Sequence, residues 1–174
     1  MLKTDRLIVR QSTFDNFENV YRLLSDAEVM RYVGRGVKTR EETEEGLEKM
    51  IHHFEKHGFS FGDVYEKGSE IFVGRAGLIY LEMNDSQPEI ELGYTLHKFF
   101  WNKGYATELA KGFIQRAFQD LFLEKLISVA HLENKGSAHV LEKAGMHYVG
   151  RISAYNTEVD KFEIFKNAAG DGHD

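Results

Sequence analysis

The sequence contains no cysteine and only one proline among its 174 residues. The lack of cysteine excludes disulfides, thiolate metal sites and cysteine nucleophiles. The single proline leaves no proline-rich linker, and 174 residues are enough for one domain with a substantial core but few for two. We therefore expect one domain over residues 1–166 and a polar, disordered tail over residues 167–174.

Long apolar runs and basic clusters are also missing. No segment approaches the length of a membrane span, and the first residues lack the apolar stretch of a secretory signal, so we expect a cytoplasmic protein that does not bind membranes. The formal net charge is −6 with no Lys/Arg cluster, which argues against a nucleic-acid partner and suits a cationic substrate such as an amine. The eight histidines do not cluster as ligands, since His52 and His53 diverge on a helix, and no metal site is expected.

Hydrophobic periodicity and turn residues predict the element order β-α-α-β-β-β-α-β-α-β-β. The predicted strands cover residues 6–11, 59–65, 70–82, 89–96, 125–131, 147–154 and 159–165. Helices are predicted around residues 17–24, 39–57, 105–118 and 134–144, with a capping box at Thr39 and Glu42 and a stop at Gly58. This order indicates an α+β fold, in which helices flank one mixed, mostly antiparallel sheet.

The segment between the strand at residues 89–96 and the long helix carries the sequence WNKGYA at residues 101–106. Free N–H groups and the helix dipole make a helix N-terminus a site for anions. Gly104 lets an oxygen approach the main chain closely, and Lys103 adds a positive charge. The glycines of a Walker loop or a G-x-G-x-x-G fingerprint are absent, so the segment alone is equally consistent with an ordinary strand-to-helix turn.

Several segments together resemble the GNAT acetyltransferase superfamily. The runs ELGYTLH at residues 91–97 and WNKGYATE at residues 101–108 are similar to its motif A, in which a Q/R-x-x-G-x-G/A loop holds the pyrophosphate of coenzyme A. Four further segments resemble the ribosomal-protein N-acetyltransferase (RimJ/RimL-like) branch and occur in the order found there. They are TDRLIVR at residues 4–10, VGRAGL at 73–78, NKGS at 134–137 and VLEKAG at 140–145. The resemblance implies a GNAT-like fold and acetyl-coenzyme A as the cosubstrate, without a metal.

The resemblance also implies which residues contact the coenzyme. They are Leu96, Trp101, Asn102, Lys103, Gly104, Tyr105, Ala106, Thr107, Asn134 and Lys143. The pyrophosphate is expected on backbone N–H groups of residues 102–107. Two positions depart from the family pattern: Trp101 stands where many members have Gln or Arg, and Asn102 stands where this branch usually has Gly.

Transfer to an amine requires that the protonated acceptor lose a proton, often to a carboxylate or an ordered water. Alternation along residues 89–93 puts Glu89 and Glu91 on one face of the strand. GNAT enzymes often carry a base on this strand, which makes Glu91 the first candidate, although a solvated strand face would explain both glutamates equally well. His131, at the end of the next strand, is the competitor because an unperturbed histidine titrates near neutral pH.

Asn134 and Ser137 open the short helix that follows. By residue type Asn134 is an N-cap and Ser137 lies at N3, so helix capping explains both. Many GNAT enzymes carry a Tyr later in this helix that protonates the departing thiolate, whereas this chain has Leu141 there. The RimJ/RimL-like branch places a Ser in N-x-x-S instead, so the resemblance makes Ser137 the candidate donor to the thiolate.

These observations lead to one principal expectation. The chain transfers acetyl from acetyl-coenzyme A to a primary amine by direct attack in a ternary complex. The acceptor is either a protein N-terminus or a small-molecule amine, and a homodimer is an allowed assembly. A non-catalytic acyl-coenzyme A-binding module is the alternative from another class, since a fold alone does not establish an activity.

Overall fold

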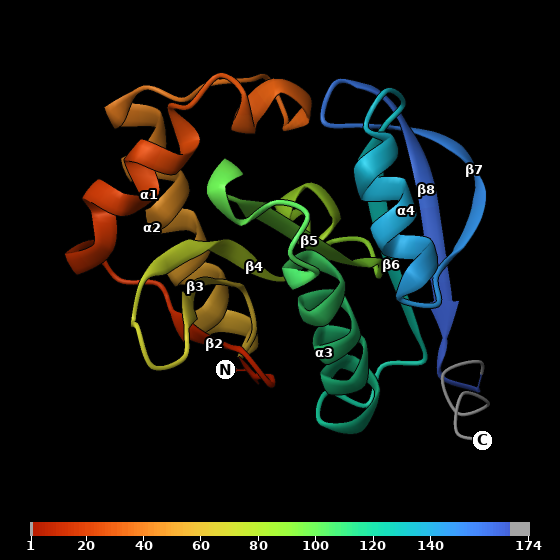
Figure 1. The fold of residues 1–174 in the computed structure, drawn as a ribbon. Coiled ribbons are helices and arrows are strands. Elements are labelled where there is room, and N and C mark those ends of the chain that lie inside the picture. The colour runs from red at the N-terminus through yellow and green to blue at the C-terminus, as the bar shows by residue number, and fades with distance from the viewer. Residues whose placement is uncertain (1, 168–174) are drawn as a thin grey trace.

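The computed structural model describes residues 2–167, so the tail predicted to be disordered lies, apart from Asn167, outside the described residues. One eight-stranded sheet runs through the described chain in the order β1-β2-β3-β4-β5-β6-β8-β7 (Figure 1). Its strands are β1 (Leu2–Lys3), β2 (Leu7–Gln11), β3 (Phe61–Glu66), β4 (Phe72–Tyr80), β5 (Ile90–Leu96), β6 (Lys125–His131), β7 (His147–Ala154) and β8 (Thr157–Phe165).

The helices are α1 (Phe17–Leu24), α2 (Arg40–His57), α3 (Tyr105–Gln119) and α4 (Lys135–Lys143). Short 3-10 turns lie at η1 (Phe14–Asn16), η2 (Val29–Tyr32), η3 (Leu81–Met83) and η4 (Lys98–Phe100). Within residues 2–167, no helix has the length and apolar content needed to cross a membrane. The order of these elements confirms the predicted α+β fold.

Neighbouring strands run antiparallel except for β5 and β6, which run parallel. α3 connects this parallel pair, as the predicted strand–helix–strand crossover requires. β5 pairs with β4 along its whole length, and β6 does the same with β8. Between β5 and β6, in contrast, the register is recorded only at Glu91 and Ile127. The sheet is therefore continuous on either side of this pair and weakly joined within it.

The main core lies between the sheet and the helices α3 and α4. Figure 1 shows these two helices in front of the sheet, and α2 behind it. Leu109, Phe113 and Ala117 recur every four residues on α3 and are buried in the same core cluster as Leu92 of β5. This spacing places one apolar face of α3 on the sheet and fixes where its N-terminus meets the end of β5.

Besides shifts of one or two residues at several strand ends, the structure differs from the sequence prediction in one added strand and one shortened strand. Alternation does not predict β1, because a strand of two residues carries no pattern. The strand predicted over residues 70–82 is shorter, since Glu70 and Glu82 both have a φ of 57° and leave the extended conformation. The capping box at Thr39 and the left-handed Gly58 at the end of α2 are confirmed. The early end of β4 matters for the site, because it turns Glu82 toward the β7–β8 hairpin.

Candidate active site

The candidate site lies where β5 and β6 separate. Besides the single recorded register pair, the Ser128 hydroxyl donates to the Leu92 carbonyl at 2.7 Å and holds the two strands together. Beyond this point, residues 93–96 of β5 continue with β4 alone, and β6 continues with β8. Because successive side chains alternate between the faces of a strand, Glu91 approaches this opening from one face and Tyr94 from the other.

The loop of residues 101–104 follows η4 and opens α3. Gly104 is the N-cap of α3, with a φ of 77°, and no side chain caps this helix, in contrast to α2 and α4. Asn102 also has a positive φ, of 58°, which asparagine tolerates better than most residues. Ala106 and Thr107 lie half-buried in the first turn. The first N–H groups of α3 are therefore left for a ligand, and an anion is the ligand that suits them.

Four further residues predicted to contact the coenzyme lie around this loop. The Leu96 carbonyl accepts the Trp101 indole N–H at 2.9 Å, which ties the start of the loop to the end of β5. Lys103 is exposed. Tyr105 is buried, and its hydroxyl donates to Glu66 at 2.6 Å. The Tyr105 side chain is thus engaged in the fold, and its backbone N–H is the group that is available to a ligand.

Glu91 is buried, with only 6% of its surface exposed. Its carboxylate accepts a hydrogen bond from the Tyr155 hydroxyl, at the tip of the β7–β8 hairpin. Burial raises the pKa of Glu91 to about 7; the Tyr155 hydrogen bond opposes this rise, and the nearby Glu82 charge adds to it. A carboxyl group that is half-ionised near neutral pH suits general-base catalysis there. The interpretation of Glu91 as part of a solvated strand face is therefore wrong.

Tyr155 is a site residue that the sequence does not indicate. Tyr155 and Asn156 form the hairpin turn with φ values of 55° and 61°. The Tyr155 N–H donates to the Glu82 carboxylate at 2.6 Å, and the Glu82 N–H donates to the Tyr155 hydroxyl at 3.3 Å. Burial and the Glu91 carboxylate raise the pKa of Tyr155, so its hydroxyl remains a donor. Its ring thus links the β8 side of the opening to the β5 side.

Glu89 shares a strand face with Glu91 but has different partners. Its carboxylate binds the Lys125 ammonium at 2.8 Å and the Lys161 ammonium at 2.7 Å. Burial opposes ionisation of Glu89, yet the two lysines lower its pKa overall. Glu89 therefore remains an ionised anchor between β5, β6 and β8, and it is a poor proton acceptor.

His131 lies at the end of β6, half-buried, as the sequence suggested. Its ring packs against the Tyr32 ring, with 5.3 Å between centroids. Its Nδ1 accepts the Glu133 backbone N–H at 3.2 Å. These contacts hold the ring against the segment after α1, and none of its recorded bonds reaches Glu91. As the general base, the geometry therefore favours Glu91 over His131.

Ser137 lies half-buried in the first turn of α4. Asn134 caps this helix by accepting the Ser137 N–H at 3.1 Å, as predicted. The Ser137 hydroxyl makes a separate 3.0 Å hydrogen bond with the Tyr94 hydroxyl, in which either group can donate. Burial raises the pKa of Tyr94 to about 12, so its hydroxyl stays protonated. Capping and hydrogen bonding to a ligand thus use different atoms of Ser137.

Two further positions of α4 that the family resemblance singled out lie away from the Ser137–Tyr94 pair. Lys143 is exposed in the last turn of α4, at the opposite end of the helix from Asn134. Leu141 is fully buried in the core and has no hydroxyl to offer. Tyr94, in contrast, was missed as a functional residue, because its alternation with Leu92 and Leu96 is typical of a core position.

Comparison with known proteins identifies the family of this chain. Residues 6–147 match the family described as the acetyltransferase (GNAT) domain. The chain belongs to the GNAT acetyltransferase family. It is 29% identical over 152 residues to the uncharacterized N-acetyltransferase YnaD of Bacillus subtilis (strain 168), covering 86% of this chain and 84% of that protein.

Solved GNAT structures share the fold over nearly the whole chain. An acetyltransferase of the GNAT family from Bacillus anthracis is 28% identical, covers 95% of this chain and 98% of its own, and has a TM-score of 0.80. A spermidine N-acetyltransferase from Vibrio cholerae, solved with CoA and spermine, is 20% identical, covers 94% and 97%, and has a TM-score of 0.76.

As a GNAT protein, the chain is an acetyl-CoA-dependent N-acetyltransferase. The uncapped start of α3, with Gly104 in the left-handed region and Lys103 exposed beside it, fits the pyrophosphate of this cosubstrate. Among residues 2–167, no group of three or more histidines and carboxylates is placed to hold a metal ion. The RimJ/RimL-like branch within the GNAT family stays a prediction.

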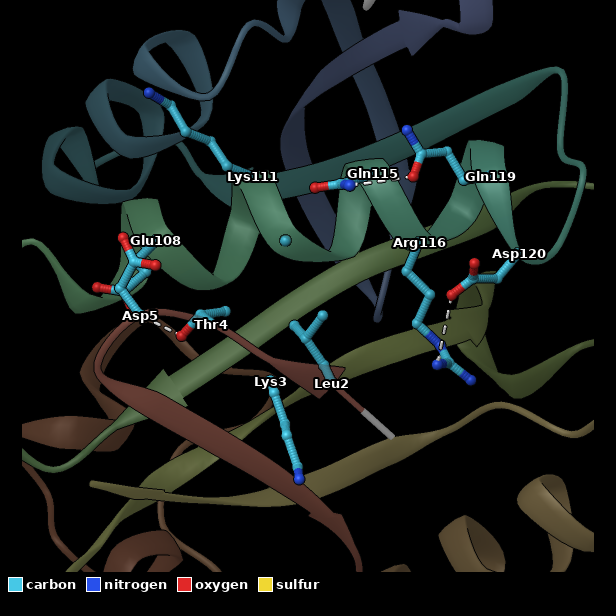
Figure 2. A pocket seen from close by; sticks show the side chains of 11 residues that line it. Leu2, Lys3, Thr4, Asp5, Glu108, Lys111, Gln115, Arg116, Gln119 and Asp120 are labelled. Carbon is cyan, nitrogen blue, oxygen red and sulfur yellow. Dashed lines mark hydrogen bonds and ion pairs between the residues drawn. The ribbon is translucent and has the colours of Figure 1, made fainter. Parts of the chain in front are cut away.

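A cavity of about 530 Å³ lies between the N-terminal segment and α3 (Figure 2). Its lining includes Leu2, Thr4 and Asp5 on one side and Lys111 and Gln115 on the other. None of the predicted site residues of this GNAT chain lines it. It is therefore separate from the opening between β5 and β6.

Proposed function

We propose that this GNAT enzyme transfers the acetyl group of acetyl-CoA to a primary amine by direct attack in a ternary complex. The observation that carries the proposal is the buried Glu91 carboxyl at the opening between β5 and β6, with a pKa raised to about 7. The sequence has no cysteine that could form an acyl-enzyme thioester. Direct attack needs only a base for the amine and a donor for the thiolate.

Glu91 acts as the base in this proposal. It takes up the proton that the amine loses as the new N–C bond forms, either directly or through one water. Tyr155 orients the carboxylate through its hydroxyl, and Glu82 fixes Tyr155 through the backbone N–H. A fixed carboxylate is more effective than a mobile one, because the proton must be transferred in one geometry.

The Ser137–Tyr94 pair stabilises the leaving group. As the C–S bond breaks, negative charge develops on sulfur, and a hydroxyl aimed at it lowers the barrier. Ser137 can donate to the sulfur while it accepts a hydrogen bond from Tyr94. The free amides of residues 102–107 hold the pyrophosphate, with Leu96, Trp101, Asn134 and Lys143 as the remaining predicted coenzyme contacts.

The acceptor is a primary amine, either of a small molecule or of a protein N-terminus. The net charge of −6 favours the approach of a cation, and an amine is a cation until its proton is removed. The spermidine enzyme of the same fold was solved with spermine, which is a polyamine, and an aminoglycoside acetyltransferase of this fold was solved with ribostamycin and coenzyme A. Polyamines, aminoglycosides and N-terminal peptides are therefore the acceptors to compare.

The test is acetyl-CoA turnover with a panel of these acceptors, measured as the release of free thiol. We expect thiol release above the amine-free rate with at least one class, and loss of that excess in the variant Glu91→Gln. Mass spectrometry of the product should show one added acetyl group on the amine. A chain that binds acetyl-CoA tightly but acetylates none of these amines would overturn the proposal in favour of a binding module.

A further inference from the structure

The loop that opens α3 is held from behind by Arg6, which lies just before β2. Arg6 Nη1 donates to the Lys103 carbonyl at 2.8 Å, and Arg6 Nε donates to the Glu108 carboxylate at 2.7 Å. The guanidinium carbon lies 4.6 Å from the centre of the Tyr105 ring. One side chain thus contacts residues on both sides of Gly104, the N-cap of the helix.

Glu108 in turn fixes Arg6. The same carboxylate accepts the Arg6 backbone N–H at 2.8 Å and the Thr4 hydroxyl at 2.5 Å. Figure 2 shows Glu108 on α3 beside Thr4 and Asp5, at the edge of the cavity. Burial opposes the ionisation of Glu108, but the bonds from Thr4 and Arg6 lower its pKa overall and keep it charged. If the Arg6 side chain turned away, it would lose its bonds to the Glu108 carboxylate and to the Lys103 carbonyl.

This arrangement determines which backbone groups the loop presents. A site made of N–H groups binds an anion only when the neighbouring carbonyl oxygens, which are negative, point elsewhere. Arg6 binds the Lys103 carbonyl, so that this oxygen is directed toward the guanidinium. The fit is close, since a Cβ atom added at Gly104 would lie 3.3 Å from Arg6 Nη2.

We propose that Arg6, locked in place by Glu108, is a positioning residue that presets the α3 loop to receive the coenzyme pyrophosphate. The inference rests on the proposed coenzyme site at residues 102–107. It gives the N-terminal segment a role in a loop that lies 97 residues later in the chain. The Arg6 side chain is 49% exposed, and an ion pair with a half-exposed partner contributes little to stability, so the effect falls on cosubstrate binding rather than on folding.

The first test compares two thioesters. Arg6→Ala should raise both the KM for acetyl-CoA and the Kd for CoA about tenfold, as expected for the loss of one charge-assisted hydrogen bond, while kcat changes little. S-acetylpantetheine carries the same thioester without a pyrophosphate, so its kcat/KM should stay at the wild-type value. A purely structural defect would lower both activities together.

Arg10→Ala is the matched control. Arg10 lies on β2, forms a 2.6 Å ion pair with Glu70, and lies 4.9 Å from the Tyr65 ring. Its side chain is 46% exposed, against 49% for Arg6. Arg10 therefore has an ion pair, a ring contact and an exposed fraction like those of Arg6, but it makes no hydrogen bond to the α3 loop. Its replacement should leave the affinity for CoA unchanged.

Glu108→Gln separates positioning from direct electrostatics. Removing a negative charge near an anion site would by itself tighten CoA binding. If Glu108 acts through Arg6, the variant instead weakens CoA binding, and the double variant with Arg6→Ala is no weaker than Arg6→Ala alone. Arg6→Lys keeps the charge but not the planar fork, so it should restore only part of the affinity.

Calorimetry with CoA decides the inference even if no acceptor is acetylated. Unchanged CoA affinity in Arg6→Ala, or equal losses with acetyl-CoA and S-acetylpantetheine, would overturn it. If Arg6→Ala does not fold, tighter CoA binding by Glu108→Gln would overturn it as well. A failure of the proposed function shows as absent turnover, on which the calorimetric measurements with CoA do not depend.

Discussion

Glu89 and Glu91 lie on the same face of one strand, yet their surroundings move their pKa values in opposite directions. Two lysines bind Glu89 and lower its pKa, whereas Glu91 is buried with only a tyrosine hydroxyl as donor, and its pKa rises to about 7. Residue type alone cannot separate an anchor from a base. The difference comes from the partners that the fold brings to each carboxylate.

The first prediction concerns Glu91→Gln. This variant keeps the shape of the side chain and a hydrogen bond to Tyr155 but cannot take up the proton, so kcat with a good acceptor should fall by about 10²–10⁴-fold. The deficit should shrink as pH rises, because more of the amine then arrives deprotonated. The measurement is the pH–rate profile of both proteins.

Tyr155→Phe is the companion variant for this test. It removes the hydrogen bond that lowers the pKa of Glu91, so the rise of activity with pH should move to higher pH while a base remains. If wild type and Glu91→Gln give parallel profiles of similar height, Glu91 is not in the mechanism, and His131 becomes the candidate.

The second prediction concerns Ser137→Ala. The hydroxyl matters only as the thiolate forms, so kcat should fall while the affinity for acetyl-CoA stays near the wild-type value. Asn134→Ala is the control for thermal stability, since it removes the cap and costs about 1 kcal/mol but leaves the hydroxyl in place; because Asn134 is also a predicted coenzyme contact, its acetyl-CoA affinity is not compared. Equal losses of thermal stability and activity in Ser137→Ala would favour a role in capping alone.

At the scale of elements, the start of α3 differs from the starts of α2 and α4. A capping box caps the N-terminus of α2, and the Asn134 side chain caps the N-terminus of α4. In contrast, α3 begins at a left-handed glycine with no side-chain cap. Orphan amides at a helix end require partners, and a cap would compete with a ligand for them. Because α1 also begins without a side-chain cap, it is the missing cap together with the left-handed Gly104 and the exposed Lys103 that is consistent with an anion site at α3.

The third prediction concerns Gly104→Val. A φ of 77° strains a β-branched residue, and the new Cβ would crowd Arg6, so the affinity for CoA should fall sharply. Gly58→Val is the control, because Gly58 has a φ of 76° at the end of α2 with nothing within 4 Å of the added Cβ. Both variants should lose stability, and only Gly104→Val should lose CoA binding in calorimetry. Unchanged affinity in Gly104→Val would exclude the proposed position of the pyrophosphate.

At the scale of the whole molecule, local patterns predicted the elements but not the contacts between distant segments. The capping box of α2, the long amphipathic α3 and the order of the strands follow from spacing within a few residues. The bond between Glu91 and Tyr155 joins residues 64 apart, and the Arg6 contact to the loop joins residues 97 apart. No periodicity encodes such pairs. Glu91 was thus a prediction from the strand and the family resemblance, while Tyr155 and Tyr94 needed the folded chain.

The last prediction concerns the pH dependence of the free energy of unfolding. The folded-state pKa of Glu91 is raised from 4.5 to about 7, so its neutral form favours folding below pH 4.5, and this contribution is lost as the pH rises to 7. At 1.36 kcal/mol per unit, the loss is about 3 kcal/mol. Glu91→Gln should therefore match wild type near pH 4.5 and be the more stable protein at pH 8, as measured by urea unfolding.

Glu89→Gln is the control with the opposite sign. The pKa of Glu89 is lowered, so its stabilisation is present above the unfolded-state pKa and is lost in acid. That variant should be less stable than wild type at pH 8 and approach it as the pH falls. A stability difference between Glu91→Gln and wild type that does not change with pH would show that Glu91 is not buried as a titrating carboxyl, and it would remove the basis for its role as the base.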